Sequence, residues 1–254
     1  MIKSRREYTL IELLVVLAVI SILMVMLISA MKVGKEKIKT SQCKDNMRAI
    51  FVSTIEYSND NQGQIVPYLL NGVFWFDELV PYGLANVDNT INAVIRNQAL
   101  YCPVTGRDGD PTGLTGMDVW KAINPDVGLN NIIASTGEGG NWTKNPISRF
   151  ATVNSVSEKV FFADTSQAGN AMQGHFKLNV LGLQLFPIGT NIGLGRLAFR
   201  HPTPMGDGQD MSDGECNMAF GDGRVDNIHF SDDRVSSQEA LEKILWRDKG
   251  DRNR

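Results

Sequence analysis

A long run of apolar residues near the N-terminus constrains this chain more than any other feature. The run extends from Leu13 to Met31, about 19 residues, and only alanine and serine interrupt it. As a helix it would rise about 28 Å, close to the minimum that spans the hydrocarbon core of a bilayer. Because Lys3, Arg5 and Arg6 precede the run, the positive-inside rule predicts a cytoplasmic N-terminus and a C-terminal domain outside the cytoplasmic membrane, periplasmic or extracellular.

Three interpretations fit the apolar run: a cleaved secretory signal, a plain membrane anchor, or a leader that is cut on the cytoplasmic side. For a secretory signal, Ile28-Ser29-Ala30 would supply the small residues that such a cleavage site needs. Glu12 distinguishes between the three interpretations, because a lone carboxylate at the start of a membrane helix is costly to bury and needs a role. Neither a secretory signal nor a plain anchor gives this carboxylate a role.

The helical pattern continues beyond the apolar run into a charged stretch. Apolar residues then recur at helical spacing along one stripe: Cys43, Met47, Ile50, Phe51 and Ile55. The Asn- and Gly-containing segment from Asn59 to Gly63 is a stop signal. The sequence therefore predicts one helix from about Tyr8 to Asn59, with its second half packed on a domain. We favour a core face over a coiled coil, because no second long heptad segment is available as a partner.

Composition is typical of one ordinary domain after this helix. The net charge is −3, without a long basic tract, which argues against a nucleic-acid binder. The middle of the chain is rich in Asn, Gly, Thr and Ser, which is typical of loops. We therefore predict a leader at 1–7, a transmembrane half-helix at 8–31, an extracytoplasmic half-helix at 32–60 and a globular domain at 61–254.

The domain should be α+β. Strand-like segments precede a closing β-hairpin, whose turn is Gly221-Asp222-Gly223. A C-terminal helix with Ser236 and Glu239 as its capping box should follow at 236–247. We expect a long N-terminal transmembrane helix packed on an antiparallel β-sheet with loop-rich insertions, and strands at 159–163, 176–185, 196–200, 216–220 and 224–230.

The segment from Arg6 to Val16 resembles the processing site of type IV prepilins and type II secretion pseudopilins. The resemblance implies a cut between Glu7 and Tyr8 by a prepilin peptidase, followed by N-methylation of Tyr8. The family most often has Gly where this chain has Glu7. Glu12 would become the fifth mature residue and pair with the cationic amine of an adjacent subunit during assembly. The implied partners are the prepilin peptidase, other pilin-like subunits that contact the N-terminal helix, and the inner membrane.

Further landmarks resemble a bacterial group of pilin-like proteins with a C-terminal His…Asp-Gly motif. They are Cys43 to Ile50, Tyr101-Cys102-Pro103, Phe161 to Thr165, Arg200-His201 and Asn217 to Val225. The resemblance implies that His201, Asp222 and Gly223 form the closing motif. Here His201 precedes Asp222 by about twenty residues, further than in the group, and 202–215 contains an apparent insertion.

The cysteines allow one intramolecular disulfide. Cys43, Cys102 and Cys216 lack the paired spacing of a metal site. Cys43 lies on the core-facing stripe and Cys102 precedes a proline in a probable loop, so a Cys43–Cys102 bridge would tie that loop to the helix. Three reduced, buried thiols are the alternative.

The sequence does not favour an enzyme. It contains no nucleophile elbow, phosphate loop or zinc-protease motif, and we expect its histidines at the surface or in turns. No cofactor is required. An acidic loop could hold calcium through Asp207, Asp210, Asp213 and Glu215, although a solvated acidic turn is the simpler interpretation. We expect a structural subunit of a type IV pilus-like or type II secretion pseudopilus assembly; the alternative is a membrane-anchored binding module that does not polymerise.

Overall fold

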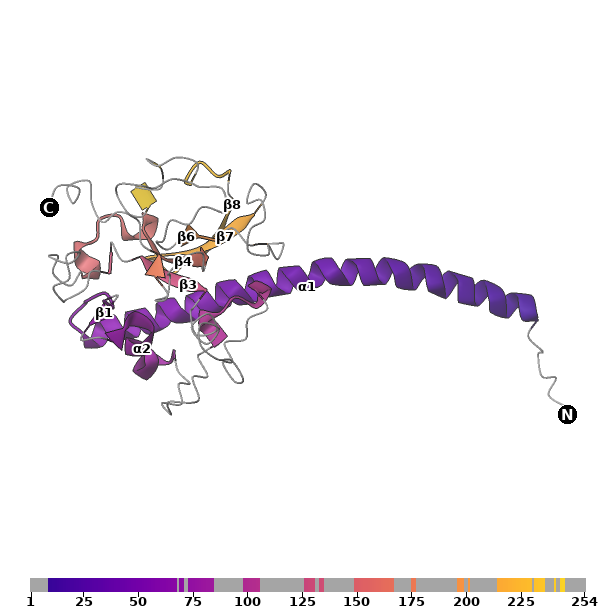
Figure 1. Ribbon diagram of the computed structural model, residues 1–254, viewed down its shortest axis with the longest axis horizontal. Coiled ribbons are helices and arrows are strands. Elements are labelled where there is room, and N and C mark those ends of the chain that lie inside the picture. The colour runs from indigo at the N-terminus through magenta and orange to yellow at the C-terminus, as the bar shows by residue number, and fades with distance from the viewer. Residues whose placement is uncertain are drawn as a thin grey trace, which may run out of the picture. The chain divides into compact units, whose positions relative to one another are not determined.

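The computed structural model describes the residues that the coloured ribbon follows (Figure 1). These are 9–67, 69–70, 73–84, 98–105, 126–130, 133–134, 149–166, 175–176, 196–198, 201, 214–229, 231–235, 240 and 243–244. The chain forms two compact units, Met1–Ile38 and Lys39–Arg254, and each is described by itself.

Helix α1 (Leu10–Asp60) is 51 residues long and confirms the predicted long helix to within two residues at each end. In the first unit, Leu10–Ile28 is long and apolar enough to cross a membrane, by length and composition. The residues of this segment are all exposed within the described part of the chain. The segment is thus compatible with a single-pass membrane anchor, although a signal sequence shares these properties.

In the second unit, α1 buries the predicted stripe. Cys43, Met47, Ile50 and Phe51 are buried, and Ile55 packs against the same core in a partly buried position. The helix ends where the sequence predicted, because Gln62 and Gly63 adopt left-handed backbone conformations at φ 58° and 78°. The amide of Gly63 donates to the carbonyl of Ser58 at 2.8 Å, which satisfies one of the last helical carbonyls.

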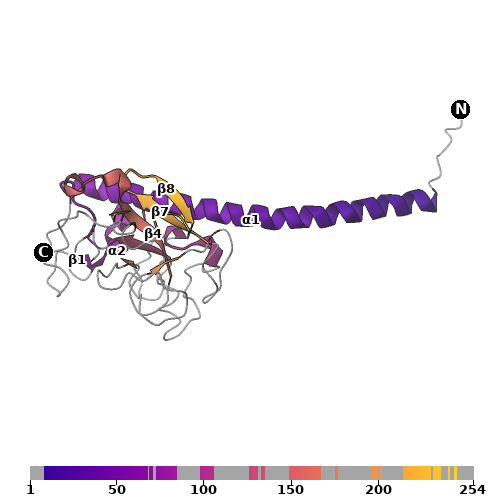
Figure 2. The same cartoon turned by 90° about the horizontal axis from the view of Figure 1, so that it is seen from above.

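Four strands of the main sheet are antiparallel and lie in the order β3-β4-β7-β8 (Figures 1 and 2). They are β3 (Val127–Asn130), β4 (Val160–Ser166), β7 (Glu215–Phe220) and β8 (Val225–His229). Two short strands extend it: β5 (His175–Phe176) pairs with β3 in parallel, which departs from the antiparallel expectation, and β6 (Arg196–Leu197) pairs with the end of β4. The helix and this sheet give the expected α+β layout.

Smaller elements complete the described part of the second unit. β1 (Leu69–Leu70) and β2 (Val73–Phe74) form a two-stranded ladder before the short helix α2 (Trp75–Glu78). Single 3₁₀ turns occur at Val80–Tyr82, Gln98–Leu100, Pro103–Thr105, Phe150–Thr152 and Val156–Glu158.

The structure confirms the strand predicted at 159–163 and both strands of the closing hairpin. Of the segments predicted at 176–185 and 196–200, only the short β5 and β6 fall among the described residues as strands. Ala240, Lys243 and Ile244 are helical, in agreement with the predicted C-terminal helix, whereas Ser236 and Glu239 lie outside the described residues. The sequence analysis did not predict β3.

Aromatic side chains join α1 to the sheet. Phe51 of α1 meets Phe161 of β4 edge to face with ring centroids 6.0 Å apart. Phe150 stacks on Phe161 at 5.1 Å and meets Phe51 edge to face at 6.5 Å. On the same strand, Phe162 contacts Trp75 of α2 at 5.3 Å. The core therefore forms around β4, which is paired on both sides.

The hairpin turn after β7 brings backbone close to this core. The amide of Gly221 donates to the carbonyl of Lys159 at 3.0 Å. A Cβ atom at Gly221 would lie 2.6 Å from both the Val156 carbonyl oxygen and Phe161 Cε2. Since real Cβ atoms do not approach backbone so closely, only glycine fits this position without a shift of the turn.

We therefore expect Gly221→Ala to destabilise the fold by about 1–3 kcal/mol, the usual cost of overpacking. Thermal unfolding of the purified chain would measure the effect. Gly34→Ala is the matched control, because a Cβ at Gly34 meets no atom within 4 Å and alanine is the better helix former. Equal midpoints for the two variants would contradict this account of the turn.

Candidate functional site

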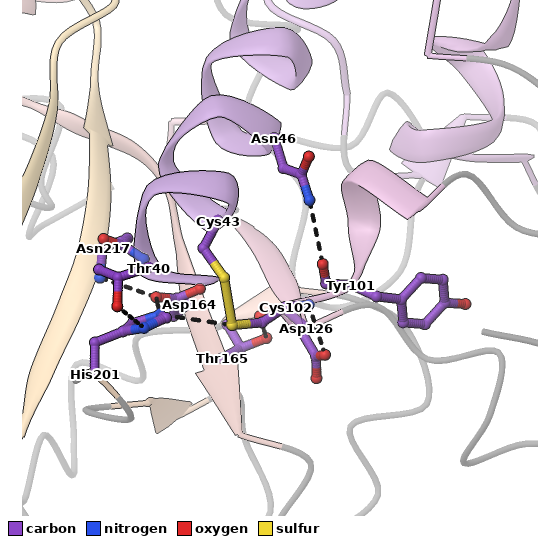
Figure 3. The surroundings of a disulfide bond; sticks show 10 residues. All are labelled: Thr40, Cys43, Asn46, Tyr101, Cys102, Asp126, Asp164, Thr165, His201 and Asn217. Carbon is purple, nitrogen blue, oxygen red and sulfur yellow. Dashed lines mark hydrogen bonds and ion pairs between the residues drawn. A yellow bond between two sulfur atoms is a disulfide. The ribbon is translucent and has the colours of Figure 1, made fainter. Parts of the chain in front are cut away.

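A group of buried polar side chains gathers where α1, the loop at Cys102 and strands β4 and β7 meet (Figure 3). We call this group the buried polar cluster. Its members come from distant parts of the sequence: the partly buried Thr40 and the buried Cys43, Cys102, Asp164, His201 and Asn217.

The predicted disulfide between Cys43 and Cys102 is present, with Cα atoms 5.4 Å apart and a sequence separation of 59. Cys216 is buried and is not part of a disulfide. A bridge of this kind typically contributes about 2–4 kcal/mol, chiefly because it constrains the unfolded chain. Here it ties the Cys102 loop to α1.

Asp126 holds the Cys102 loop from the other side. Its carboxylate accepts the amide of Cys102 at 2.9 Å, and its backbone carbonyl accepts the amide of Thr165 at 2.7 Å. Thr165 belongs to β4, so one fully buried residue connects the loop to the central strand. Asp126 therefore helps to fix the position of Cys102 beside β4.

His201 is fully buried, which shows that the expected surface or turn position was wrong for this histidine. Its backbone pairs with Glu215 in an isolated antiparallel bridge that prolongs the β-structure at the start of β7. Its Nε2 lies 3.3 Å from Asp164 Oδ2 and 3.5 Å from Cys102 Sγ, while its Nδ1 lies 3.2 Å from Thr40 Oγ1 (Figure 3). The ring thus has a polar contact at each nitrogen.

Asp164 lies in the central strand of the sheet and is only 1% exposed, so its carboxylate is buried. Its Oδ2 accepts the amide of Asn217 at 2.9 Å in addition to its contact with His201. Its Oδ1 and both side-chain polar atoms of Asn217 have no hydrogen-bond partner among the described residues. Such atoms are rare in folded proteins, since an unsatisfied buried polar group costs about 1–3 kcal/mol.

His201 and the Asp222-Gly223 turn do not form one site. The bridge places His201 beside Glu215 at the start of β7, whereas Asp222 lies in the turn after the end of that strand. At about 3.3 Å per residue the two ends of the strand are about 17 Å apart. Asp222 is exposed and accepts the amide of Arg224 at 3.0 Å. The carboxylate that faces His201 is that of Asp164.

The acidic calcium candidates stay a prediction. Asp207, Asp210 and Asp213 lie outside the described residues. Glu215 is the first residue of β7, where its carboxylate accepts a hydrogen bond from Asn227 Nδ2 at 2.6 Å. This contact gives Glu215 a role in the hairpin that needs no metal.

At the start of α1, Glu12 forms a capping box with Thr9. Its Oε2 accepts the Thr9 amide at 2.8 Å and the Thr9 hydroxyl at 2.9 Å, while the Glu12 amide donates to Thr9 Oγ1 at 3.3 Å. A carboxylate in the first helical turn also interacts favourably with the helix dipole. Glu12 therefore has a local structural role that the sequence analysis missed. Glu7 and Tyr8 lie outside the described residues.

Sequence reasoning also missed Asp164, Asn217 and Thr40 as site residues. A signal existed for two of them, because Asp164 follows Phe161-Phe162-Ala163 and Asn217 stands between Cys216 and Met218 in strand-like apolar runs. A carboxylate or an amide at such a position is buried only with partners. The partners of Asp164 and Asn217 could not be predicted from the sequence, because they belong to other elements of the fold.

The cluster also contains a set of metal-ligating atoms. One ligand atom each of Cys43, Cys102 and His201 lies within 4.8 Å of the others, and all three residues are buried.

Comparisons with family models, with curated proteins and with solved structures found no match for this chain.

We expect Asp164→Ala to destabilise the fold by about 2–5 kcal/mol, because it leaves His201 and the Asn217 amide buried without their acceptor. Thermal unfolding of the full chain would measure the loss. Asp222→Ala is the matched control: it removes an exposed aspartate, so its effect should stay within about 0.5 kcal/mol. A larger loss for Asp222→Ala than for Asp164→Ala would show that the histidine motif depends on the turn after all.

Proposed function

We propose that this chain is a pilin-like structural subunit of a type IV pilus-like or type II secretion pseudopilus assembly. The observation that carries the proposal is the apolar segment Leu10–Ile28, whose side chains are exposed along the whole segment. Such a surface needs either lipid or neighbouring apolar helices around it. A subunit that moves from the membrane into a filament would use the same segment first against lipid and then against the helices of neighbouring subunits.

The continuity of α1 supports this role. The helix that begins with the apolar segment also supplies Met47, Ile50 and Phe51 to the core of the second unit. One continuous helix therefore contributes residues to both the candidate anchor and the domain. In this proposal, the basic residues before the helix stay in the cytoplasm, the second unit lies outside the cytoplasmic membrane, and a prepilin peptidase removes residues 1–7.

A structural role fits the buried polar cluster better than catalysis does. Cys102, Asp164 and His201 are each at most 1% exposed, so no substrate reaches them without opening of the fold. The cluster instead connects α1 with β4 and with the bridge beside β7. We therefore propose a subunit without enzyme activity.

The capping box favours a second candidate function. Because Thr9 already satisfies Glu12 within the chain, the carboxylate has a use in a helix that never meets another subunit. A membrane-anchored extracytoplasmic binding module that does not polymerise would have the same N-terminal helix. The two candidates differ in whether the charge of Glu12 or only its hydrogen bonding matters.

The mature N-terminus tests the proposed processing. We expect intact-mass analysis of the membrane-extracted protein to give a chain that begins at Tyr8 and carries one methyl group on its amine. The reason is the Glu7-Tyr8…Glu12 arrangement ahead of the apolar helix. A chain that begins at Met31 would show a secretory signal and exclude the pilin-like interpretation, whereas an uncut chain that stays in the membrane would favour the plain anchor.

Two matched variants separate assembly from capping. Glu12→Gln removes the charge but keeps a side chain that can close a capping box, whereas Thr9→Ala removes the cap and keeps the charge. If Glu12 pairs with the amine of a neighbouring subunit, Glu12→Gln should lower incorporation into cross-linked oligomers by about tenfold or more, and Thr9→Ala should lower it much less. Both variants should still insert in the membrane, which fractionation would check. Full incorporation of Glu12→Gln would reject the assembly role of the charge.

A further inference from the structure

We propose that the buried polar cluster is a redox-gated zinc site. In the disulfide state it covalently ties α1 to the Cys102 loop. Once a dithiol has reduced the disulfide, four side chains would bind one Zn²⁺ in its place: Cys43, Cys102, His201 and Asp164. The inference rests on the second unit alone and is independent of the proposed membrane and assembly role.

The distances already approach those of a zinc site. Tetrahedral zinc with Zn–S bonds of about 2.3 Å and Zn–N or Zn–O bonds of about 2.0–2.2 Å holds its ligand atoms about 3.3–3.8 Å apart. His201 Nε2 lies 3.5 Å from Cys102 Sγ and 3.3 Å from Asp164 Oδ2. Two changes are needed. The sulfur atoms must separate, which rotation of the cysteine side chains can provide once their bond is broken, and the carboxylate of Asp164 must turn toward them, because of the four side chains only Cys43, Cys102 and His201 have ligand atoms within 4.8 Å of one another.

Asp164 supplies an independent observation that points to a missing ligand. Its carboxylate is buried against His201, and its Oδ1 has no hydrogen-bond partner among the described residues. A buried carboxylate oxygen of this kind is costly unless a cation or a donor completes it. Zinc bound to Oδ2 would offset the buried charge of this carboxylate and give a donor set of two sulfurs, one nitrogen and one oxygen, which suits the preference of zinc for mixed N, S and O ligands.

Thr40 is placed to orient the histidine. Zinc needs the lone pair of Nε2, so the ring proton must be on Nδ1, which lies 3.2 Å from Thr40 Oγ1. A hydrogen bond from Nδ1–H to an oxygen fixes the tautomer and the ring orientation of metal-ligating histidines in general. Thr40 is a positioning residue here, one helical turn before Cys43 on the same face of α1.

The exchange balances without any further reactant. The dithiol gives two electrons and two protons to the Cys43–Cys102 bond, so that two thiols form and the dithiol becomes a disulfide. Zn²⁺ then replaces the two thiol protons, which are released to solvent. Because protein ligands would fill all four positions, the metal would hold the fold together instead of activating a substrate.

The test uses the full chain in detergent, prepared metal-free in its oxidised form and in a dithiothreitol-reduced form that is desalted under anaerobic conditions. Each form is mixed with Zn²⁺ and passed over a desalting column before elemental analysis. We expect about one zinc per reduced chain and none per oxidised chain. In the reduced chain, Co²⁺ should produce thiolate charge-transfer and tetrahedral d–d absorption bands, and Zn²⁺ should raise the thermal unfolding midpoint.

Variants decide which residues bind. Cys43→Ser, Cys102→Ser and His201→Ala should each lower zinc affinity by at least about tenfold, whereas Cys216→Ser should not. Cys216→Ser is the matched control, because an unfolded chain could use any cysteine and would then lose affinity equally in all three cysteine variants. Asp164→Asn should weaken binding and shift the cobalt d–d bands, a spectroscopic change that a purely structural role would not produce.

Two results would overturn the proposal. One is a reduced wild-type chain that retains no zinc, whether it is folded or not. The other is zinc binding that Cys216→Ser weakens as much as Cys43→Ser does.

Discussion

The contact between one stripe of α1 and strand β4 is the interaction on which the second unit depends. Phe51 and Phe161 meet edge to face there, and Met47 and Ile50 are fully buried beside them. Each fully buried apolar side chain of this kind contributes about 1.5–3 kcal/mol relative to an exposed one. Because β4 also pairs with β3 and β7, the same contact fixes where the neighbouring strands lie.

The buried polar cluster is the polar counterpart of that contact. The apolar stripe reaches Cys43 at its N-terminal end, and there the partners become a disulfide, a histidine and a carboxylate. A polar group inside a close-packed interior is tolerated only in a definite geometry, since each unpaired atom is costly. The cluster therefore helps to specify the position of α1 on β4, which burial of apolar side chains alone specifies less sharply.

The N-terminal helix shows how one residue can serve two purposes. Glu12 closes the first turn of α1 through Thr9, and in the proposed assembly it would also meet the amine of a neighbour. A carboxylate can accept several hydrogen bonds at once, so the two roles are chemically compatible. Assembly is therefore not the only role that accounts for Glu12, because its carboxylate also caps the first turn of α1.

The sequence by itself determined the elements whose signals are local. The apolar run and the stripe predicted α1 almost to its ends, the Gly221-Asp222-Gly223 turn predicted the closing hairpin, and the positions of Cys43 and Cys102 predicted the bridge. Only the tertiary structure decided the partner of His201. The bridge to Glu215 fixes this histidine at one end of β7 and leaves Asp222 at the other. Spacing along the chain cannot reveal which carboxylate lies beside His201. An extended strand places residues of one sequence motif far apart in space, whereas pairing between strands brings together residues that are far apart in sequence.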